Sequence, residues 1–192
     1  MKMRRGFLLC LLLLCPGCAQ LPPAGSRTIL DPQSGNTLLL VTQPLVFARE
    51  RMDVAAYARD YVTLVAVELD AAGHYSDYLL VYRWSTVDKR MSPLPQAGKG
   101  ELRIEADGRT IVLPALAQLP VGVAGQGVLH YPPHADVITY GYQIDLGTLR
   151  FIALSRHILV RLPQESLDLP FSLWRDGRAS LAQFVRAEGG PQ

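Results

Sequence analysis

Two long apolar segments joined by a short turn sequence constrain the fold of this chain more than any other feature. They are Asp60–Leu69 (DYVTLVAVEL) and Tyr75–Trp84 (YSDYLLVYRW), with Asp70-Ala-Ala-Gly73 between them. Both are rich in β-branched and aromatic residues, which favour strands, and the short connection ending in glycine favours a hairpin. Because both faces of the first strand are apolar, the hairpin is predicted to lie inside a sheet that is covered on two sides.

Shorter strand signals surround this hairpin. Asp107-Gly108 between two alternating runs predicts a type I′ turn, because such a turn needs positive φ at both central residues. In the run Thr37–Phe47, Pro44 indicates either an edge strand or two short pieces. A Pro- and Gly-rich stretch, residues 114–135, is predicted to be a long surface excursion. The remaining predicted strands are Asp136–Asp145, Ile158–Leu162 and Leu169–Trp174.

Helical periodicity appears only towards the C-terminus. Leu146–Leu154 has apolar residues at helical spacing after Asp145, a possible N-cap. A last helix is predicted over residues 178–187, capped by Asp176, with an apolar stripe. The predicted class is therefore α+β, a mainly antiparallel β-sheet with two short C-terminal helices. The alternative is an all-β sandwich in which Leu146–Leu154 is also a strand. The stripe consists of Leu181, Phe184 and Val185.

The first residues of the chain follow the plan of a secretory signal. Lys2, Arg4 and Arg5 precede an apolar run, Phe7–Leu14, that is about half as long as a membrane-spanning helix requires. Residues 19–36 are rich in Pro, Gly, Ser and Gln, and are predicted to be a flexible tether with little ability to bury a core.

The end of this signal, Leu14-Cys15-Pro16-Gly17-Cys18, resembles the lipobox of bacterial lipoproteins, in which a small residue precedes an invariant cysteine. The resemblance implies cleavage before Cys18 and a diacylglycerol thioether on its sulfur, usually with a third acyl chain on the new amino terminus. Two or three chains give stable membrane anchoring. In lipoproteins of enteric bacteria an aspartate after the cysteine favours inner-membrane retention. Ala19 stands there, so the resemblance implies the outer membrane, facing the periplasm.

The predicted organisation is a lipoprotein signal peptide (residues 1–17), a lipidated Cys18 with its tether (18–36), and a single globular β-rich domain (37–192). All three cysteines lie at or before position 18, so the domain has no disulfide, no cysteine nucleophile and no thiolate metal ligand. Loss of the signal changes the formal charge from +2 to −1. Since no basic stripe is present, nucleic acid is not a predicted partner.

No metal site and no cofactor are predicted. His130 and His134 are four residues apart, but Pro132 and Pro133 between them prevent the helix on which that spacing would place both on one face. The glycines of VGVAGQGV, residues 121–128, do not have the spacing or the following helix of a dinucleotide site. No G-x-S-x-G nucleophile elbow is present.

No catalytic residue is predicted either. The mixed charges of Arg49-Glu50-Arg51-x-Asp53 and the carboxylate pairs Glu101/Glu105 and Asp70/Asp77 are interpreted as solvated. The aromatic residues are ordinary strand residues by propensity, and the alternative is a binding patch. They are Tyr75, Tyr78, Tyr82, Trp84, Tyr131, Tyr140 and Tyr142.

The function favoured by these observations is non-catalytic. We expect a membrane-anchored lipoprotein that binds a protein partner in the cell envelope or supports an envelope assembly. One alternative is a lipoprotein that binds a small ligand or glycan through its Tyr-rich surface, in a deep apolar pocket. The other is a periplasmic hydrolase of unfamiliar type, with a nucleophile close to His130, His134 or His157.

Overall fold

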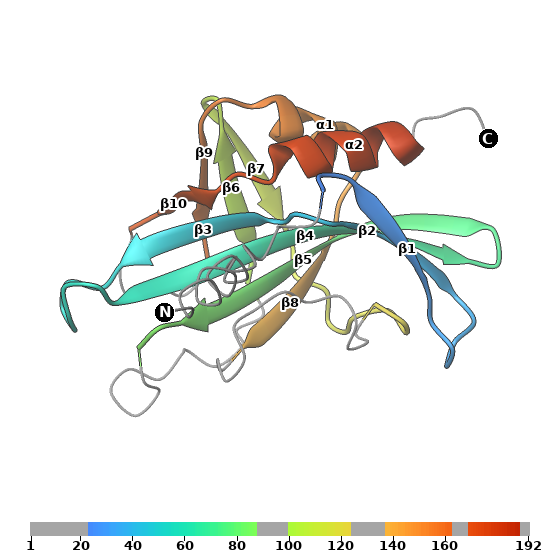
Figure 1. The fold of residues 1–192 in the computed structure, drawn as a ribbon, viewed down its shortest axis with the longest axis horizontal. Helices are drawn as coiled ribbons and strands as arrows, with labels where there is room; N and C mark the ends of the chain where they lie inside the picture. Colours follow the sequence, from blue (N-terminus) through green and yellow to red (C-terminus); the bar gives the residue numbers. More distant parts are fainter. Residues whose placement is uncertain (1–22, 88–99, 124–136, 163–168, 189–192) are drawn as a thin grey trace, which may run out of the picture.

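The computed structural model describes residues 23–87, 100–123, 137–162 and 169–188. These residues form a mainly antiparallel ten-stranded sheet and two helices (Figure 1). The predicted α+β class is confirmed. Because Leu146–Leu154 is a helix, the all-β sandwich alternative is wrong.

The predicted central hairpin is present as β4 (Arg59–Ala71) and β5 (His74–Ser85), which pair along almost their whole length. Ala72 and Gly73 form the turn with φ of +55° and +85°, as a type I′ turn requires. The carboxylate of Asp70 accepts a hydrogen bond of 2.7 Å from the Gly73 N–H. Residues 60–67 of β4 are buried without interruption, on both faces, so the prediction of a strand covered on both faces is confirmed.

The hairpin is flanked on both sides. Strands β2 (Thr37–Val41) and β3 (Leu45–Glu50) lie end to end along one edge of β4, and β8 (Ile138–Gln143) pairs with β5. Pro44 lies in the break between β2 and β3, where it has no N–H to contribute to a ladder. The predicted run Thr37–Phe47 is therefore two strands.

The folded domain starts earlier than the sequence predicts. Strand β1 (Ser26–Leu30) pairs antiparallel with β2, although we predicted a tether through residue 36. The hydroxyl of Thr42 also donates a hydrogen bond of 2.8 Å to the carbonyl oxygen of Pro23. The tether prediction is wrong for residues 23–36, because β1 is held by its pairing with β2. A short, partly polar edge strand does not reveal in its own sequence that such a partner exists.

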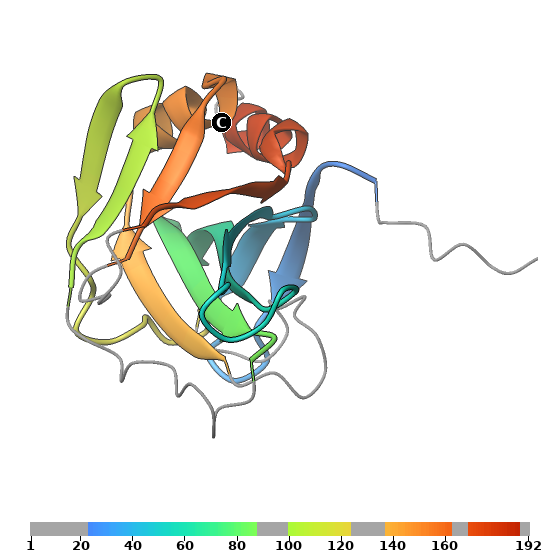
Figure 2. The ribbon, with the colours of Figure 1, turned by 90° about the vertical axis from the view of Figure 1, so that its left-hand side faces the viewer.

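The second half of the sheet is built from long-range pairs. Its strands are β10 (Phe171–Arg175), β9 (Ile158–Arg161), β6 (Leu102–Ala106) and β7 (Arg109–Leu113), in that order from β3. Asp107 and Gly108 join β6 to β7 with φ of +45° and +82°, which confirms the predicted type I′ turn. Ala115 forms a bridge with Tyr142 of β8, so the sheet curls round until β7 approaches β8 (Figure 2).

Both predicted helices are present and begin where predicted. The N-cap of α1 (Leu146–Leu154) is Asp145, whose carboxylate accepts a hydrogen bond of 2.8 Å from the Thr148 N–H. Asp176 accepts one of 3.0 Å from the backbone N–H at the start of α2 (Arg178–Glu188). Within the described ranges, no helix is long and apolar enough to cross a membrane. The buried helical side chains include Leu149, Ile152, Leu181, Phe184 and Val185.

Alternation along β4 defines two faces of the sheet. Leu64 and Ala66 surround the same small void as Leu149 of α1 and Leu181 of α2, and we call this side the helix face. The odd-numbered residues of β4, among them Tyr61, point to the opposite side, which we call the outer face.

Part of the predicted surface excursion covers the outer face. Leu119 lies so close to Gly141 of β8 that a Cβ there would collide with it, and Val123 is buried. Within residues 114–123 the predicted surface excursion therefore holds only in part, because Val121 is 73% exposed whereas Leu119 and Val123 pack inwards, and the remainder, 124–135, lies outside the described residues.

Candidate functional site

Several residues singled out from the sequence lie outside the described ranges. These are Cys18, His130, His134 and Tyr131, so lipidation and the absence of a histidine metal site remain predictions. His157 is exposed, and its backbone N–H donates a hydrogen bond of 2.8 Å to the carboxylate of Asp107. His157 directly precedes β9 (Ile158–Arg161) and is held through its backbone.

The tyrosines do not gather into one surface. Tyr82 and Tyr142 are buried core residues, and Tyr78 and Tyr140 pack against the core. Tyr75 is exposed near the tip of the central hairpin. The described tyrosines of the predicted set are therefore core or sheet residues, whereas Trp84 of the same set belongs to a separate aromatic cluster.

This aromatic cluster consists of Tyr61, Trp84 and Trp174 on the outer face. Tyr61 and Trp84 are paired across β4 and β5, and their rings stack with centroids 3.9 Å apart and planes 8° from parallel. Trp174 of β10 meets Tyr61 edge to face at 6.3 Å. The Arg59 guanidinium lies 4.5 Å from the centroid of the Trp174 ring, a cation–π distance.

Trp174 occupies an irregularity in its strand. Leu173 pairs with Phe47 and Arg175 pairs with Val46, so two steps along β10 correspond to one step along β3. Trp174 is therefore the extra residue of a β-bulge, a feature that redirects a side chain. The indole is 56% exposed although it is held from one side by Tyr61 and from another by Arg59.

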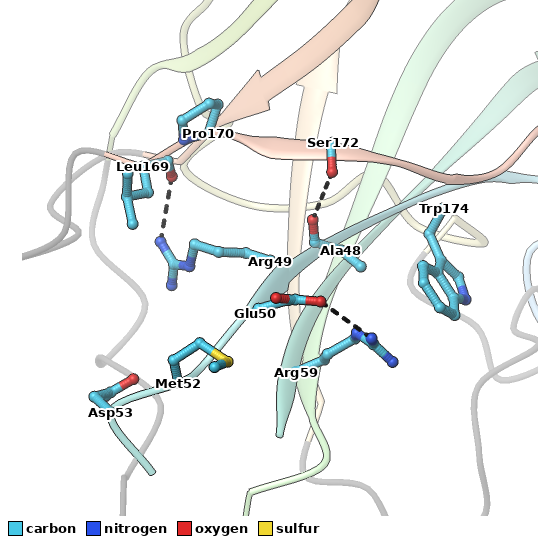
Figure 3. Close-up of a pocket in the computed structure, with 10 residues that line it drawn as sticks. All are labelled: Ala48, Arg49, Glu50, Met52, Asp53, Arg59, Leu169, Pro170, Ser172 and Trp174. Atoms are coloured by element: carbon cyan, nitrogen blue, oxygen red, sulfur yellow. Dashed lines mark hydrogen bonds and ion pairs between the residues drawn. The ribbon is translucent and has the colours of Figure 1, made fainter. Parts of the chain in front are cut away.

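The bulge borders a surface groove of about 580 Å³, which we call the Trp174 groove (Figure 3). Met52 and Leu169 on its border are 69% and 58% exposed, so three large apolar side chains border it. Ser172 supplies a hydroxyl, which lies 3.3 Å from the carbonyl oxygen of Ala48 and donates to it. The lining residues are Ala48, Arg49, Glu50, Met52, Asp53, Arg59, Leu169, Pro170, Ser172 and Trp174.

Two ion pairs lie at the groove. Arg59 pairs with Glu50 at 3.2 Å, across neighbouring strands. Arg51 pairs with Asp53 at 2.9 Å, in the connection between β3 and β4. The hydrogen bonds that Arg51 donates to Asp53 lower the pKa of that carboxyl group. The groove therefore combines an apolar surface with charges of both signs.

A buried charge network lies behind the groove, where we predicted a solvated connection. Asp60 is completely buried and accepts hydrogen bonds from Arg49 at 3.0 Å, Arg51 at 3.1 Å and the Ser85 hydroxyl at 2.7 Å. Arg83 lies 3.9 Å away and, like Arg49, is buried. The prediction of solvated charges is wrong for Arg49, which points to the helix face with Asp60.

The protonation of Asp60 follows from these contacts. Burial alone would raise its pKa, but the hydrogen bonds from Ser85, Arg49 and Arg51 outweigh burial and lower the pKa below the ordinary aspartate value. Asp60 is thus a carboxylate at neutral pH. Because Arg49 contacts both Asp60 and the carbonyl oxygen of Leu169, the network ties the wall of the groove to the sheet.

A carboxylate trio, Glu68, Asp77 and Glu188, lies at the other end of the central hairpin. Their nearest oxygens are within 4.8 Å of one another, and no other group of three such ligands occurs among the described residues. Burial, with the charges of Asp77 and Glu68, raises the pKa of Glu188 to about 8. Glu188 is therefore largely protonated at neutral pH, and its Oε1 atom is buried without a hydrogen-bond partner in the described part of the chain.

The chain matches no protein family, no curated protein and no solved structure. The functional argument therefore rests on the groove, the charge network and the residues around them.

Proposed function

We propose that this chain is a lipid-anchored lipoprotein of the outer membrane, facing the periplasm, and that it binds a partner protein through the Trp174 groove without catalysing a reaction. The anchor is the diacylglycerol on Cys18 that the lipobox resemblance implies. The binding surface is the apolar border formed by Met52, Leu169 and Trp174.

The observation that carries the proposal is the exposure of Trp174 at a β-bulge. A tryptophan that is 56% exposed leaves a large apolar area in water, an arrangement typical of interaction surfaces. Tryptophan is also among the residues that contribute most to protein interfaces. The exposed Met52 adds an adaptable side chain next to it.

The groove is held in shape before a partner arrives. Tyr61 and Arg59 fix the indole from two sides, and Asp60 fixes Arg49 behind the wall. Groups that are already ordered lose less conformational entropy on association, so a preorganised surface binds more tightly. This favours a role in recognition.

The polar groups of the groove favour binding over hydrolysis. The Ser172 hydroxyl donates to a backbone carbonyl oxygen, whereas a nucleophilic serine needs a base to accept its proton. Arg59 and Glu50 already pair with each other, which suits a partner whose rim carries charges of both signs. The face of Trp174 beneath Arg59 is occupied, so the ring offers a partner its remaining surface.

The proposal is tested by quantitative co-isolation of proteins from cross-linked envelopes with three forms of the lipoprotein. Trp174→Ala is expected to reduce recovery of the partner about 30-fold, as loss of about 2 kcal/mol at an interface hot spot would. Tyr75→Ala is the matched control, since Tyr75 is 52% exposed on a different part of the surface, and it should recover the partner normally.

Thermal unfolding of all three forms separates a lost contact from a lost fold. If Trp174→Ala melts like the wild type and still recovers every protein that the wild type recovers, the groove is not the binding surface. If glycans or small molecules, rather than a protein, are recovered in a Trp174-dependent way, the protein-binding proposal is wrong.

A further inference from the structure

The two helices present a second surface that the Trp174 groove does not use. On their side away from the sheet, α1 and α2 enclose an apolar groove of about 330 Å³, lined by Arg150, Ala153, Leu154, Ala182, Val185 and Arg186. Leu154 is 73% exposed, and both arginines are exposed. In the part of the chain that the structure describes, neither guanidinium pairs with a carboxylate.

The chain enters the domain beside this surface. The Gly25 N–H donates a hydrogen bond of 3.1 Å to the Ser180 hydroxyl of α2, and a Cβ on Gly25 would lie 3.1 Å from the side-chain oxygen of Gln183. Pro23 is held by Thr42. The N-terminal end of the described domain is therefore fixed against α2 (Figure 2).

Covalent geometry then limits the distance to the anchor. Only residues 19–22 separate Cys18 from Pro23, and a fully extended chain covers at most about 3.6 Å per residue, so the sulfur of Cys18 lies within roughly 20 Å of Pro23. A lipid on Cys18 would hold α2 close to the bilayer surface. The Trp174 groove lies at β3, β10 and the connections next to them, and shares no lining residue with this helix surface.

We infer that the outer surface of α1 and α2 rests on the membrane, with Leu154 among the headgroups and Arg150 and Arg186 against anionic phospholipids. This inference rests on the proposed lipidation of Cys18. Apolar side chains flanked by arginines are typical of helices that lie in a membrane interface, and each arginine near an anionic surface adds to the attraction. Membrane contact at the helices leaves the Trp174 groove, which has a separate lining, open to a partner.

The test uses the mature lipoprotein reconstituted into vesicles of phosphatidylethanolamine and phosphatidylglycerol. Since no cysteine follows Cys18, Leu154→Cys introduces a single thiol that can carry an environment-sensitive fluorophore. The matched control is Met52→Cys, which places the label at the Trp174 groove. Quenching by lipids that carry a quencher near the headgroup reports which label lies at the membrane.

The label at position 154 is expected to be quenched at least about twofold more than the label at position 52, because interfacial side chains enter the headgroup region by about 5–10 Å. Arg150→Gln combined with Arg186→Gln, or vesicles without phosphatidylglycerol, should remove most of that difference. Equal quenching at both positions, or stronger quenching at position 52, would overturn the inference.

Two further results separate this inference from the proposed function. Mass spectrometry of the mature N-terminus shows directly whether Cys18 is acylated, and an unmodified terminus would refute the anchor itself. If Cys18 is acylated and position 154 is shielded only when a second protein is added, the helix surface is a protein interface and the membrane inference is wrong, while the anchor stands.

Discussion

Replacement of Asp60 by asparagine tests the buried charge network most sharply. The change removes the negative charge that faces Arg49, Arg51 and Arg83 and keeps the size of the side chain. Arg49 and Arg83 are only 6% and 5% exposed in their side chains, so they would keep their charges with little access to water. Breaking a buried pair by removing one partner costs about 3–5 kcal/mol.

The expected cost of Asp60→Asn lies at the lower end of that range. The asparagine oxygen can still accept one hydrogen bond, for example from Ser85 or Arg49, so we expect a loss of about 3 kcal/mol in the free energy of unfolding. For a domain of this size that corresponds to a fall in Tm of roughly 6–12 °C. Urea denaturation of the mature protein in detergent, followed by tryptophan fluorescence, measures the loss.

Asp53→Asn is the matched control, because Asp53 binds the same Arg51 but its side chain is 55% exposed, and exposed ion pairs contribute little. The wild type should also lose stability as the pH falls through the lowered pKa of Asp60, since a depressed acid pKa stabilises the fold only above that value. Asp60→Asn should lack this loss. Equal unfolding free energies for Asp60→Asn and Asp53→Asn would refute the argument.

Three further predictions concern other parts of the molecule. Gly177→Ala should destabilise the domain by about 2 kcal/mol or more, because the new Cβ would collide with the backbone carbonyl groups of Gln43 and Pro44. Backbone atoms cannot easily move away, so an unchanged Tm would contradict this prediction. Because the pKa of Glu188 is raised, the folded state binds more protons than the unfolded state between about pH 4.5 and 8. The unfolding free energy of the wild type should therefore fall as the pH rises through that window, and that of Glu188→Gln should fall less. Parallel pH profiles for the two proteins would disprove this prediction. The purified mature protein should contain no stoichiometric zinc, and a chelator should leave its Tm unchanged; one zinc per chain, lost in both His130→Ala and His134→Ala, would show the opposite.

Turns, helix starts and the central strand could be predicted from the sequence, because each depends on residues that are close together in the chain. Asp107-Gly108 predicts its turn through the positive φ that glycine permits, and Asp145 predicts the start of α1 through the hydrogen bond it accepts from Thr148. The apolar faces of β4 predict its central place in the sheet. None of these depends on a distant residue.

The candidate site could not be read in the same way, because distant segments assemble it. Trp174 is an ordinary strand residue until its register against β3 reveals the bulge, and register is a property of two strands. Asp60 and Arg83 are far apart in the chain, although their positions on one face of a predicted hairpin were an available signal. Strand β1 was missed because its stability comes from β2 and from the contacts of Pro23 and Gly25.

The most direct test of the central claim is photo-crosslinking in intact cells from a photoreactive amino acid at position 52. Met52 borders the Trp174 groove and is 69% exposed, so a partner in the groove should give a discrete crosslinked species in the envelope fraction. We expect Trp174→Ala to abolish this species and Tyr75→Ala to leave it unchanged. A crosslink that persists in Trp174→Ala, or that forms equally from a photoreactive residue at position 75, would contradict the account.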